Sequence, residues 1–320
     1  MTGSPTIDKT LLRDLSLVGH GGQGKVWATG SIRINGDWPG VYKEYTDAAR
    51  SRLDTAVLRR LIELVPALPP DTGRWLCEQS AWPAALVEEQ GAVRGFLMRR
   101  IPDTFEVSLP RRDGTVNRRP AGFQFLLNPD DYLARMAVPI DDRKRLLLLT
   151  DLARTLAEFH RLGVVVGDLS PNNLLFDLDS EPPRCFFIDC DAMRVHGASV
   201  LPQVETNDWE VPAGEELATE ASDAYKLGLM AIRLFARDQS CRDPTALGVV
   251  SGKAAALAVR SQSRDPSDRP APADWLPVLL AATADTVTRP DPVVPPRFPA
   301  AVMITVGLIV ALVCLIAAFA

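Results

Sequence analysis

The residues of this sequence that are best suited to chemistry are an aspartate, an asparagine five positions later, and a second aspartate beyond an apolar run. They are Asp168 and Asn173 in the stretch Gly-Asp-Leu-Ser-Pro-Asn-Asn, and Asp189 in the stretch Ile-Asp-Cys-Asp. One carboxylate can orient an attacking hydroxyl, and the other oxygens are the hard ligands that hold Mg²⁺ against phosphates. The set predicts transfer of a nucleotide's terminal phosphoryl group and leaves the acceptor open.

A glycine-rich stretch near the N-terminus is a second candidate site. It has G-x-G-x-x-G spacing followed by a valine, and its candidate nucleotide contacts are Gly19, Gly21, Gly22, Gly24 and Val26. Glycine lets the backbone approach phosphates closely and present N–H groups to them. Residues 26–28 and 31–34 alternate like strands, which favours a strand–turn–strand over the helix that a dinucleotide-binding fold requires.

Two charged residues after the glycine stretch extend the candidate site. Lys43 lies in the β-like run 40–45, where an ammonium can contact a nucleotide's phosphates, although an isolated strand lysine would face solvent. The segment from Asp47 to about Leu68 has the periodicity of a helix. Glu63 in that segment is the best-placed carboxylate to pair with Lys43, and a solvated glutamate is the alternative.

Apolar patterning outlines the elements that would position these residues. A helix is expected to begin at Asp141 and to end at Gly163, which leads the chain to Asp168. A Ser-Asp-x-Tyr-x-x-Gly motif with Asp223 opens a later helix, and an Asp-Pro-Ser-Asp-Arg-Pro segment with Arg269 follows it. Strands are expected at 84–87, 95–101, 174–176 and 185–188, and a charged loop at 111–119.

Composition and charge exclude some classes of function. The chain has 320 residues and a net charge of −5, so it lacks the basic excess of a nucleic-acid-binding protein. Its five cysteines have no CxxC spacing, and they indicate neither a disulfide framework nor a zinc site. We therefore expect reduced thiols in a cytosolic domain.

The C-terminal end has a different composition. Residues 300–320 carry no charge, follow a Pro-rich stretch at 284–299, and would be about 31 Å long as a helix, enough to cross a bilayer. We expect a single-pass tail anchor in the plasma membrane, with small residues that would allow self-association. Arg289 and Arg297 precede it, which favours a cytoplasmic location for the preceding domain.

The order of these motifs resembles that of a protein kinase over residues 10 to about 280. More narrowly, the two aspartate stretches are similar to those of a bacterial group of atypical Ser/Thr kinase-like proteins. The late Asp223 and Arg269 motifs separate the sequence from the aminoglycoside phosphotransferase family. The resemblance implies an α+β bilobal fold, with a small β-rich N-lobe at 1–101 and a large helical C-lobe at 102–283. The linker at 284–299 and a transmembrane helix at 300–320 would follow.

Carried over residue by residue, the resemblance implies the parts of an ATP- and Mg²⁺-dependent site. Asp168 would orient the substrate hydroxyl and take its proton, and Asn173 and Asp189 would hold Mg²⁺. Lys43 would grip the phosphates beneath the glycine stretch, paired with Glu63. Loss of Asp189 or Lys43 should therefore abolish activity almost completely.

The resemblance also implies two structural roles in the C-lobe. Asp223 would hydrogen-bond to the backbone of the catalytic loop, residues 166–173. Arg269 would pair with a glutamate, for which the sequence offers Glu215 or Glu216, because Ala213 stands where such kinases have that glutamate.

The catalytic stretches depart from the kinase pattern at several positions. Val166 and Gly167 replace His and Arg, so no cation stands beside Asp168 to receive a phosphate. We hypothesise that activity does not wait on phosphorylation of Ser199 or Thr206. Other departures are Ser170 in place of a lysine and Cys190-Asp191 in place of Phe-Gly, where Asp191 adds a carboxylate near the metal or faces solvent.

Two functions follow from these observations. The first is a membrane-anchored, ATP-dependent Ser/Thr protein kinase whose partner is a protein substrate. The second is a pseudokinase that acts as an ATP-binding scaffold, favoured by the departures at Val166, Gly167, Ser170 and Ala213. A small-molecule phosphotransferase is a third possibility.

Overall fold

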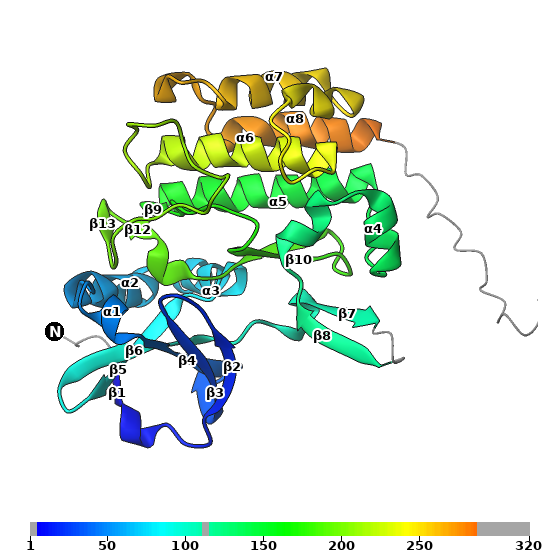
Figure 1. The fold of residues 1–320 in the computed structure, drawn as a ribbon. Coiled ribbons are helices and arrows are strands. Elements are labelled where there is room, and N and C mark those ends of the chain that lie inside the picture. The colour runs from blue at the N-terminus through cyan, green and yellow to red at the C-terminus, as the bar shows by residue number, and fades with distance from the viewer. Residues whose placement is uncertain (1–4, 111–114, 287–320) are drawn as a thin grey trace, which may run out of the picture. The chain divides into compact units, whose positions relative to one another are not determined.

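Six strands form the N-terminal sheet of the computed structural model, which describes residues 5–110 and 115–286 (Figure 1). The order across the sheet is β1-β5-β6-β4-β3-β2, with antiparallel neighbours except for the parallel pair β1 and β5. The strands are β1 (Thr6–Asp8), β2 (Ser16–His20), β3 (Gly24–Ile34), β4 (Trp38–Tyr45), β5 (Pro83–Glu89) and β6 (Ala92–Arg99).

The helical segment expected at 47–68 is divided into two helices, and a third helix follows. They are α1 (Asp47–Arg50), α2 (Thr55–Ala67) and α3 (Pro70–Gln79). The break has a local cause, because the Asp54 side chain accepts hydrogen bonds from the N–H groups of Ala56 and Val57 and so starts a new helix. The apolar stripe of α2 is buried in the core beside β5, including Val57, Leu58 and Leu61.

A hairpin connects the sheet to the helical part of the chain. It consists of β7 (Glu106–Pro110) and β8 (Val116–Pro120), preceded by the 3-10 turn η2 (Asp103–Phe105) and followed by η3 (Phe123–Leu127) and α4 (Asp130–Arg135). The sequence predicts a charged loop at 111–119. Residues 111–114 lie outside the described residues, and the rest of that stretch is mostly β8.

Four helices form the framework of the C-terminal part, and Figure 1 shows them stacked on the side away from the sheet. They are α5 (Asp142–Arg161), α6 (Glu220–Ala236), α7 (Gly252–Ser261) and α8 (Pro272–Asp285). The boundaries expected for α5 are confirmed, because the Asp141 side chain caps its first turn and Gly163 adopts a left-handed φ of 72° just after its end.

Short strands carry the catalytic stretches between α5 and α6. These strands are β9 (Val164–Val165), β10 (Leu174–Asp177), β11 (Arg184–Phe187), β12 (Arg194–Val195) and β13 (Ala198–Ser199), and the 3-10 turn η4 (Cys190–Ala192) lies among them. The expected pair of strands is confirmed as the antiparallel ladder of β10 and β11. The turns η5 (Pro244–Val249) and η6 (Pro266–Asp268) join the later helices, and η1 (Lys9–Leu11) lies near the N-terminus.

One large apolar core extends from the N-terminal sheet into the helices. The Phe159 ring of α5 lies 5.9 Å from that of Trp75 on α3 and 5.1 Å from that of Phe187 on β11, measured between centroids. Aromatic pairs of this kind add about 0.5–1.5 kcal/mol to the stabilisation by burial alone. The core therefore fixes α3, α5 and β11 relative to one another, directly beneath the catalytic stretches.

The mixed α+β architecture is consistent with a kinase-like fold, but the predicted fold class also included a transmembrane helix, and this needs correction. Within residues 5–110 and 115–286, no helix is both long and apolar enough to cross a membrane. The longest of them, α5, carries Asp151, Arg154 and Glu158 in addition to charged residues at its ends, and such charges are costly in a bilayer. The segment 300–320 lies outside the described residues, as does most of the predicted linker, so the described fold includes no membrane span.

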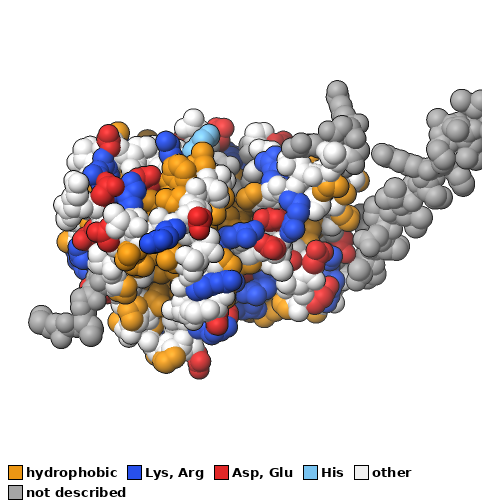
Figure 2. All heavy atoms as spheres, turned by 90° about the horizontal axis from the view of Figure 1, so that it is seen from below, with side chains coloured by type: hydrophobic (Ala, Val, Ile, Leu, Met, Phe, Trp, Pro, Cys, Tyr) orange, Lys and Arg blue, Asp and Glu red, His pale blue; other side chains and the backbone are white. Residues whose placement is uncertain are grey.

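The surface shown in Figure 2 carries charges of both signs. Lysine and arginine side chains alternate with aspartate and glutamate across this face, with small apolar areas between them. The basic side chains on this face are therefore interspersed with acidic ones.

Candidate active site

The glycine stretch forms the tip of the hairpin between β2 and β3, as the alternation of its flanks indicated. Gly24 is required by packing, because a Cβ there would collide with the carbonyl oxygen of Glu44 on β4. A Cβ at Gly21 or Gly22 would meet no atom within 4 Å, so the tip is open. The hairpin carries all five predicted nucleotide contacts, which are Gly19, Gly21, Gly22, Gly24 and Val26.

Lys43 lies on β4 opposite Val26 and is almost fully buried, with 7% of its side chain exposed. Its ammonium forms an ion pair with Asp189 and a second with Asp191, at 2.6 Å from Asp191 Oδ1. The other oxygen of Asp191 accepts a hydrogen bond of 2.8 Å from the hydroxyl of Tyr45. Asp191 is fully buried. Asp189 caps the turn η4 and Asp191 lies within it, so one turn supplies both carboxylates that hold the lysine.

Burial and charge act against each other in this cluster. Burial lowers the pKa of Lys43, but the charges of Asp191 and Asp189 outweigh it, so that its pKa is raised above the ordinary lysine value. Burial raises the pKa of Asp191, and the ammonium of Lys43 opposes this rise. The charged ammonium is the form that the two carboxylates favour.

Glu63, the residue predicted to pair with Lys43, lies at an exposed position on α2. The carboxylates that the structure places on Lys43 are those of Asp189 and Asp191. The sequence left Asp191 either near the metal or facing solvent. It is buried against Lys43, and a role for Glu63 stays a prediction.

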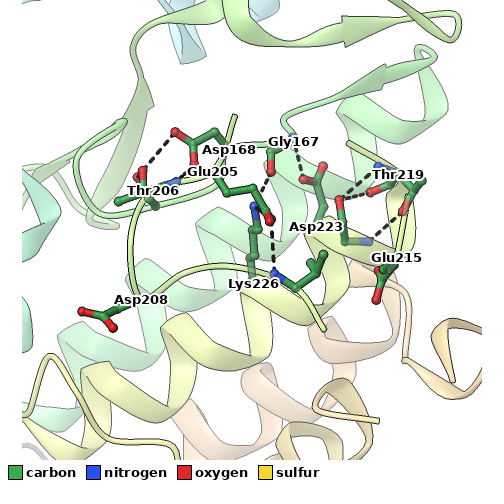
Figure 3. Close-up of polar contacts among 12 residues, drawn as sticks. Gly167, Asp168, Glu205, Thr206, Asp208, Glu215, Thr219, Asp223 and Lys226 are labelled. Atoms are coloured by element: carbon green, nitrogen blue, oxygen red, sulfur yellow. Dashed lines mark hydrogen bonds and ion pairs between the residues drawn. The ribbon is translucent and has the colours of Figure 1, made fainter. Parts of the chain in front are cut away.

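Asp168 lies at the centre of a small network of hydrogen bonds (Figure 3). Its Oδ1 accepts the backbone N–H of Thr206 at 2.8 Å, and its Oδ2 accepts the Thr206 hydroxyl at 3.0 Å and the Asn173 side-chain amide at 2.9 Å. The same Thr206 hydroxyl lies 3.1 Å from Ser170 Oγ. A carboxylate has about four acceptor sites, so Asp168 keeps one with which to receive a substrate hydroxyl.

The two stretches that carry Asp168 and Asp189 are joined by backbone hydrogen bonds. Asn173 offers its carbonyl to the N–H of Ile188 at 3.0 Å, and the next residues pair in the ladder of β10 and β11. Asp189 follows in a left-handed conformation with φ of 60°, an uncommon geometry for a residue with a side chain. The three residues predicted to bind nucleotide and metal, Lys43, Asn173 and Asp189, are therefore brought to one place.

The side-chain oxygens of Asp189 and Asn173 fit a magnesium–nucleotide complex. Magnesium usually binds one or two protein carboxylates and takes the rest of its ligands from substrate phosphates and water. Asp189 supplies a partly exposed carboxylate, and Asn173 still has its side-chain oxygen after its amide donates to Asp168. Within the described residues, no group of three or more His, Cys, Asp or Glu side chains could hold a metal by itself. The phosphates would have to complete the site.

Asp223 anchors the catalytic loop to α6, and the backbone contact predicted for it is present. Its Oδ1 accepts the N–H of Gly167 at 2.8 Å (Figure 3). Its Oδ2 accepts the N–H of Val166 at 2.8 Å and lies 3.0 Å from His160 Nε2. Gly167 has a φ of 73°, and a Cβ there would lie 2.7 Å from that of Ala218. The glycine that replaces a kinase arginine is thus required by the backbone geometry of this loop.

The glutamate partner of Arg269 is Glu215. The two side chains form a pair of hydrogen bonds, each of 2.6 Å, with the arginine side chain fully buried and lying over the ring of Tyr225. Glu216, the other candidate, pairs with Arg194 at the surface. The sequence could not distinguish the two glutamates, because they are adjacent and only the turn geometry decides which one points inward.

Several contributors to the site were not predicted from the sequence. Tyr45 contacts Asp191 and His160 contacts Asp223. Lys226 contacts the carbonyl of Gly167, and Glu205 contacts Lys226. Thr206 was considered only as a site of phosphorylation. Lys226 lies one helical turn after Asp223, so its spacing could have indicated a second contact from α6 to the loop. The others depend on tertiary contacts that no local pattern reveals.

The region around these stretches is similar to a known kinase family. Residues 121–198 match the profile of the Lipopolysaccharide kinase (Kdo/WaaP) family. The matched segment runs from η3 to β13 and includes Asp168, Asn173 and Asp189, and it covers less than half of the chain. A comparison with curated proteins gives no match. The similarity supports a kinase-like phosphotransferase of the protein-kinase-like superfamily, and it leaves the acceptor open.

Proposed function

We propose that this chain is an ATP- and Mg²⁺-dependent phosphotransferase that transfers the γ-phosphoryl group to serine or threonine hydroxyls of a protein. The observation that carries the proposal is the convergence of Lys43, Asp189, Asn173 and Asp168, which come from separate segments of the chain. Phosphoryl transfer depends mainly on positioning and neutralisation of charge, and these four side chains supply both.

Each residue has a defined task in this mechanism. Asp168 receives the acceptor hydroxyl at its remaining site and takes its proton, while Asn173 and Thr206 hold the carboxylate in place. Lys43 supplies a fixed positive charge to the phosphates, and the glycine tip covers them with backbone N–H groups. Asp189 and Asn173 would hold Mg²⁺, which when bound neutralises charge on the phosphates.

A sugar hydroxyl is a second candidate acceptor. The similarity of residues 121–198 to the lipopolysaccharide kinase family favours it, because that name describes transfer to a glycolipid. The protein acceptor is favoured by features outside the matched segment. These features are the Asp223 motif that opens α6 and the buried pair of Arg269 and Glu215, which correspond in order to the late motifs of protein kinases.

The experiment is transfer of labelled phosphate from ATP by the full chain with Mg²⁺, offered casein in one reaction and a lipopolysaccharide core oligosaccharide in another. Asp168→Asn and Asp189→Asn serve as inactive variants, and Asp265→Asn serves as a matched control on the exposed turn η6. We expect label in protein that the two site variants abolish and the control keeps.

The other outcomes identify the alternatives. Label in the oligosaccharide alone would replace the proposed acceptor with a sugar. Thermal stabilisation by MgATP with no transfer to either acceptor would contradict the enzyme and support an ATP-binding scaffold.

A further inference from the structure

A buried lysine of α6 links the catalytic loop to the segment that follows β13. Lys226 is fully buried, and its Nζ donates to the carbonyl of Gly167 at 2.6 Å and pairs with Glu205 Oε1 at 2.6 Å (Figure 3). A buried ammonium is tolerated only when charge and hydrogen bonds compensate its loss of water. Here one partner belongs to the loop that carries Asp168, and the other lies nearly 40 positions later in the chain.

Glu205 also makes a hydrogen bond within its own segment of the chain. Its Oε1 also accepts the backbone N–H of Val211 at 3.2 Å, so the carboxylate closes residues 205–211 into a loop. The side chain of Glu205 is only 12% exposed. The next residue, Thr206, donates both its N–H and its hydroxyl to Asp168. The position of Glu205 therefore determines whether Thr206 can reach the catalytic carboxylate.

Two side chains of α6 contact the catalytic loop, and each binds a different backbone group of Gly167. Asp223 accepts the N–H of Gly167, and Lys226 donates to the carbonyl of that residue. Of these two residues, only Lys226 also reaches the segment 205–211, which Arg233 of α6 contacts separately through the carbonyl of Asp208 at 2.8 Å. Asp223 thus fixes the loop to the helix, whereas Lys226 fixes the loop and the later segment to each other.

We propose that Lys226 and Glu205 form a positioning latch, which holds residues 205–211 against the catalytic loop and so orients Asp168 through Thr206. Both charges of the latch are side chains of the chain itself, and it needs no phosphate group on Ser199 or Thr206. The catalytic consequence rests on the proposed phosphotransferase function, whereas the structural link between the two segments does not.

The test compares the full-length wild type with Lys226→Met and Glu205→Gln. Lys253→Met, which makes the same substitution at an exposed position of α7, is the matched control. Glu205→Gln keeps the shape of the side chain and guards against misfolding of the lysine variant. Three quantities are measured for each protein: kcat, the KM for ATP, and amide hydrogen exchange in the peptide that covers 200–211. The wild type is also assayed after phosphatase treatment.

We expect both latch variants to lose at least tenfold in kcat with a KM for ATP within twofold of wild type. Exchange in 200–211 should rise at least tenfold while α5 and α6 stay protected. Phosphatase treatment should leave wild-type activity unchanged.

Three results would overturn the latch: unchanged exchange in 200–211 in a folded variant, kcat within twofold of wild type in both variants, or loss of wild-type activity after phosphatase treatment. If the wild type transfers no phosphate at all, the proposed function fails, and the exchange measurement still decides whether the latch exists.

Discussion

Asp191 is a carboxylate that the kinase pattern lacks, and its side chain contacts the ammonium of Lys43. It is fully buried two positions after Asp189, and its carboxylate contacts both the ammonium of Lys43 and the hydroxyl of Tyr45. Because Lys43 and its carboxylate partners join the β4 strand to the η4 turn, orientation of the lysine depends on that turn.

This arrangement can be tested by removing one charge at a time. Asp191→Asn should lower kcat/KM by about 10- to 100-fold, because a hydrogen bond to a charged group contributes about 1.5–3 kcal/mol. Glu63→Gln should leave kcat/KM within twofold of wild type. The measurement is steady-state phosphate transfer with both variants at matched folded fractions. A large loss in Glu63→Gln with a small loss in Asp191→Asn would restore the pairing predicted from the sequence.

At the scale of elements, the glycine hairpin combines two kinds of glycine. Gly24 is excluded from bearing a side chain by the neighbouring strand β4, whereas Gly22 at the tip has empty space around it. Of the two, Gly22 has the open space around it in which a ligand could bind.

The two glycines therefore give different results when changed to alanine. Gly24→Ala forces β3 and β4 apart, and we expect a loss of about 1–3 kcal/mol in the free energy of unfolding, as is typical of overpacking. Gly22→Ala should leave the free energy of unfolding within about 0.5 kcal/mol of wild type, and it should weaken binding of MgATP. Urea unfolding and calorimetric titration measure the two effects. Equal destabilisation by the two changes would contradict these separate roles for the glycines.

The elements also show what the sequence could reveal and what it could not. The ends of α5, the ladder of β10 and β11, and the glycine hairpin were predictable, because a capping aspartate, a left-handed glycine and local alternation specify them. The break between α1 and α2 was missed, since one side chain, Asp54, outweighs a continuous apolar stripe. The β7–β8 hairpin was missed because β8 is polar and mostly exposed.

At the site, the residue types and their order predict a metal position and a base position, but they do not predict the partners of these side chains. Lys43, Asn173 and Asp189 converge as the motif order required. The pairing of Lys43 with Asp191 could not be foreseen, because it joins residues nearly 150 positions apart and nothing in the local sequence records it.

Across the whole molecule, one buried ion pair connects separate parts of the C-terminal helical region. Arg269 and Glu215 connect the start of α6 to the turn before α8, and the arginine also donates to the carbonyls of Ser263 and Ala221. The pair of Arg194 and Glu216 is less buried, because the Glu216 side chain is 68% exposed.

The two arginines provide a matched comparison of burial. Arg269→Met leaves the Glu215 charge buried without its partner, so the free energy of unfolding should fall by about 3–5 kcal/mol. Arg194→Met breaks a surface pair and should lower it by no more than about 1 kcal/mol. Urea unfolding of both variants measures the difference. Similar losses in the two would show that burial of Arg269 has no energetic consequence.

The reactivity of the cysteines depends on how deeply each thiol is buried. Burial raises the pKa of Cys77 to about 11 and also raises those of Cys185 and Cys190, so these thiols stay protonated at pH 8. Cys241 is half-buried and should react with a thiol reagent at least tenfold faster than these three, as mapped by mass spectrometry of labelled peptides. Rapid labelling of Cys190 in the native protein would show that the η4 turn is not packed as described.

We propose that Asp189 and Asn173 share one divalent cation with the phosphates of a nucleotide that Lys43 contacts. The most direct test of this claim is a crystal structure with Mn²⁺ and a non-hydrolysable ATP analogue, in which anomalous scattering locates the metal. We predict an anomalous peak bound by both Asp189 and Asn173, with the γ-phosphate beside Asp168. A nucleotide bound with its metal on other side chains, or a peak that touches neither residue, would contradict this claim.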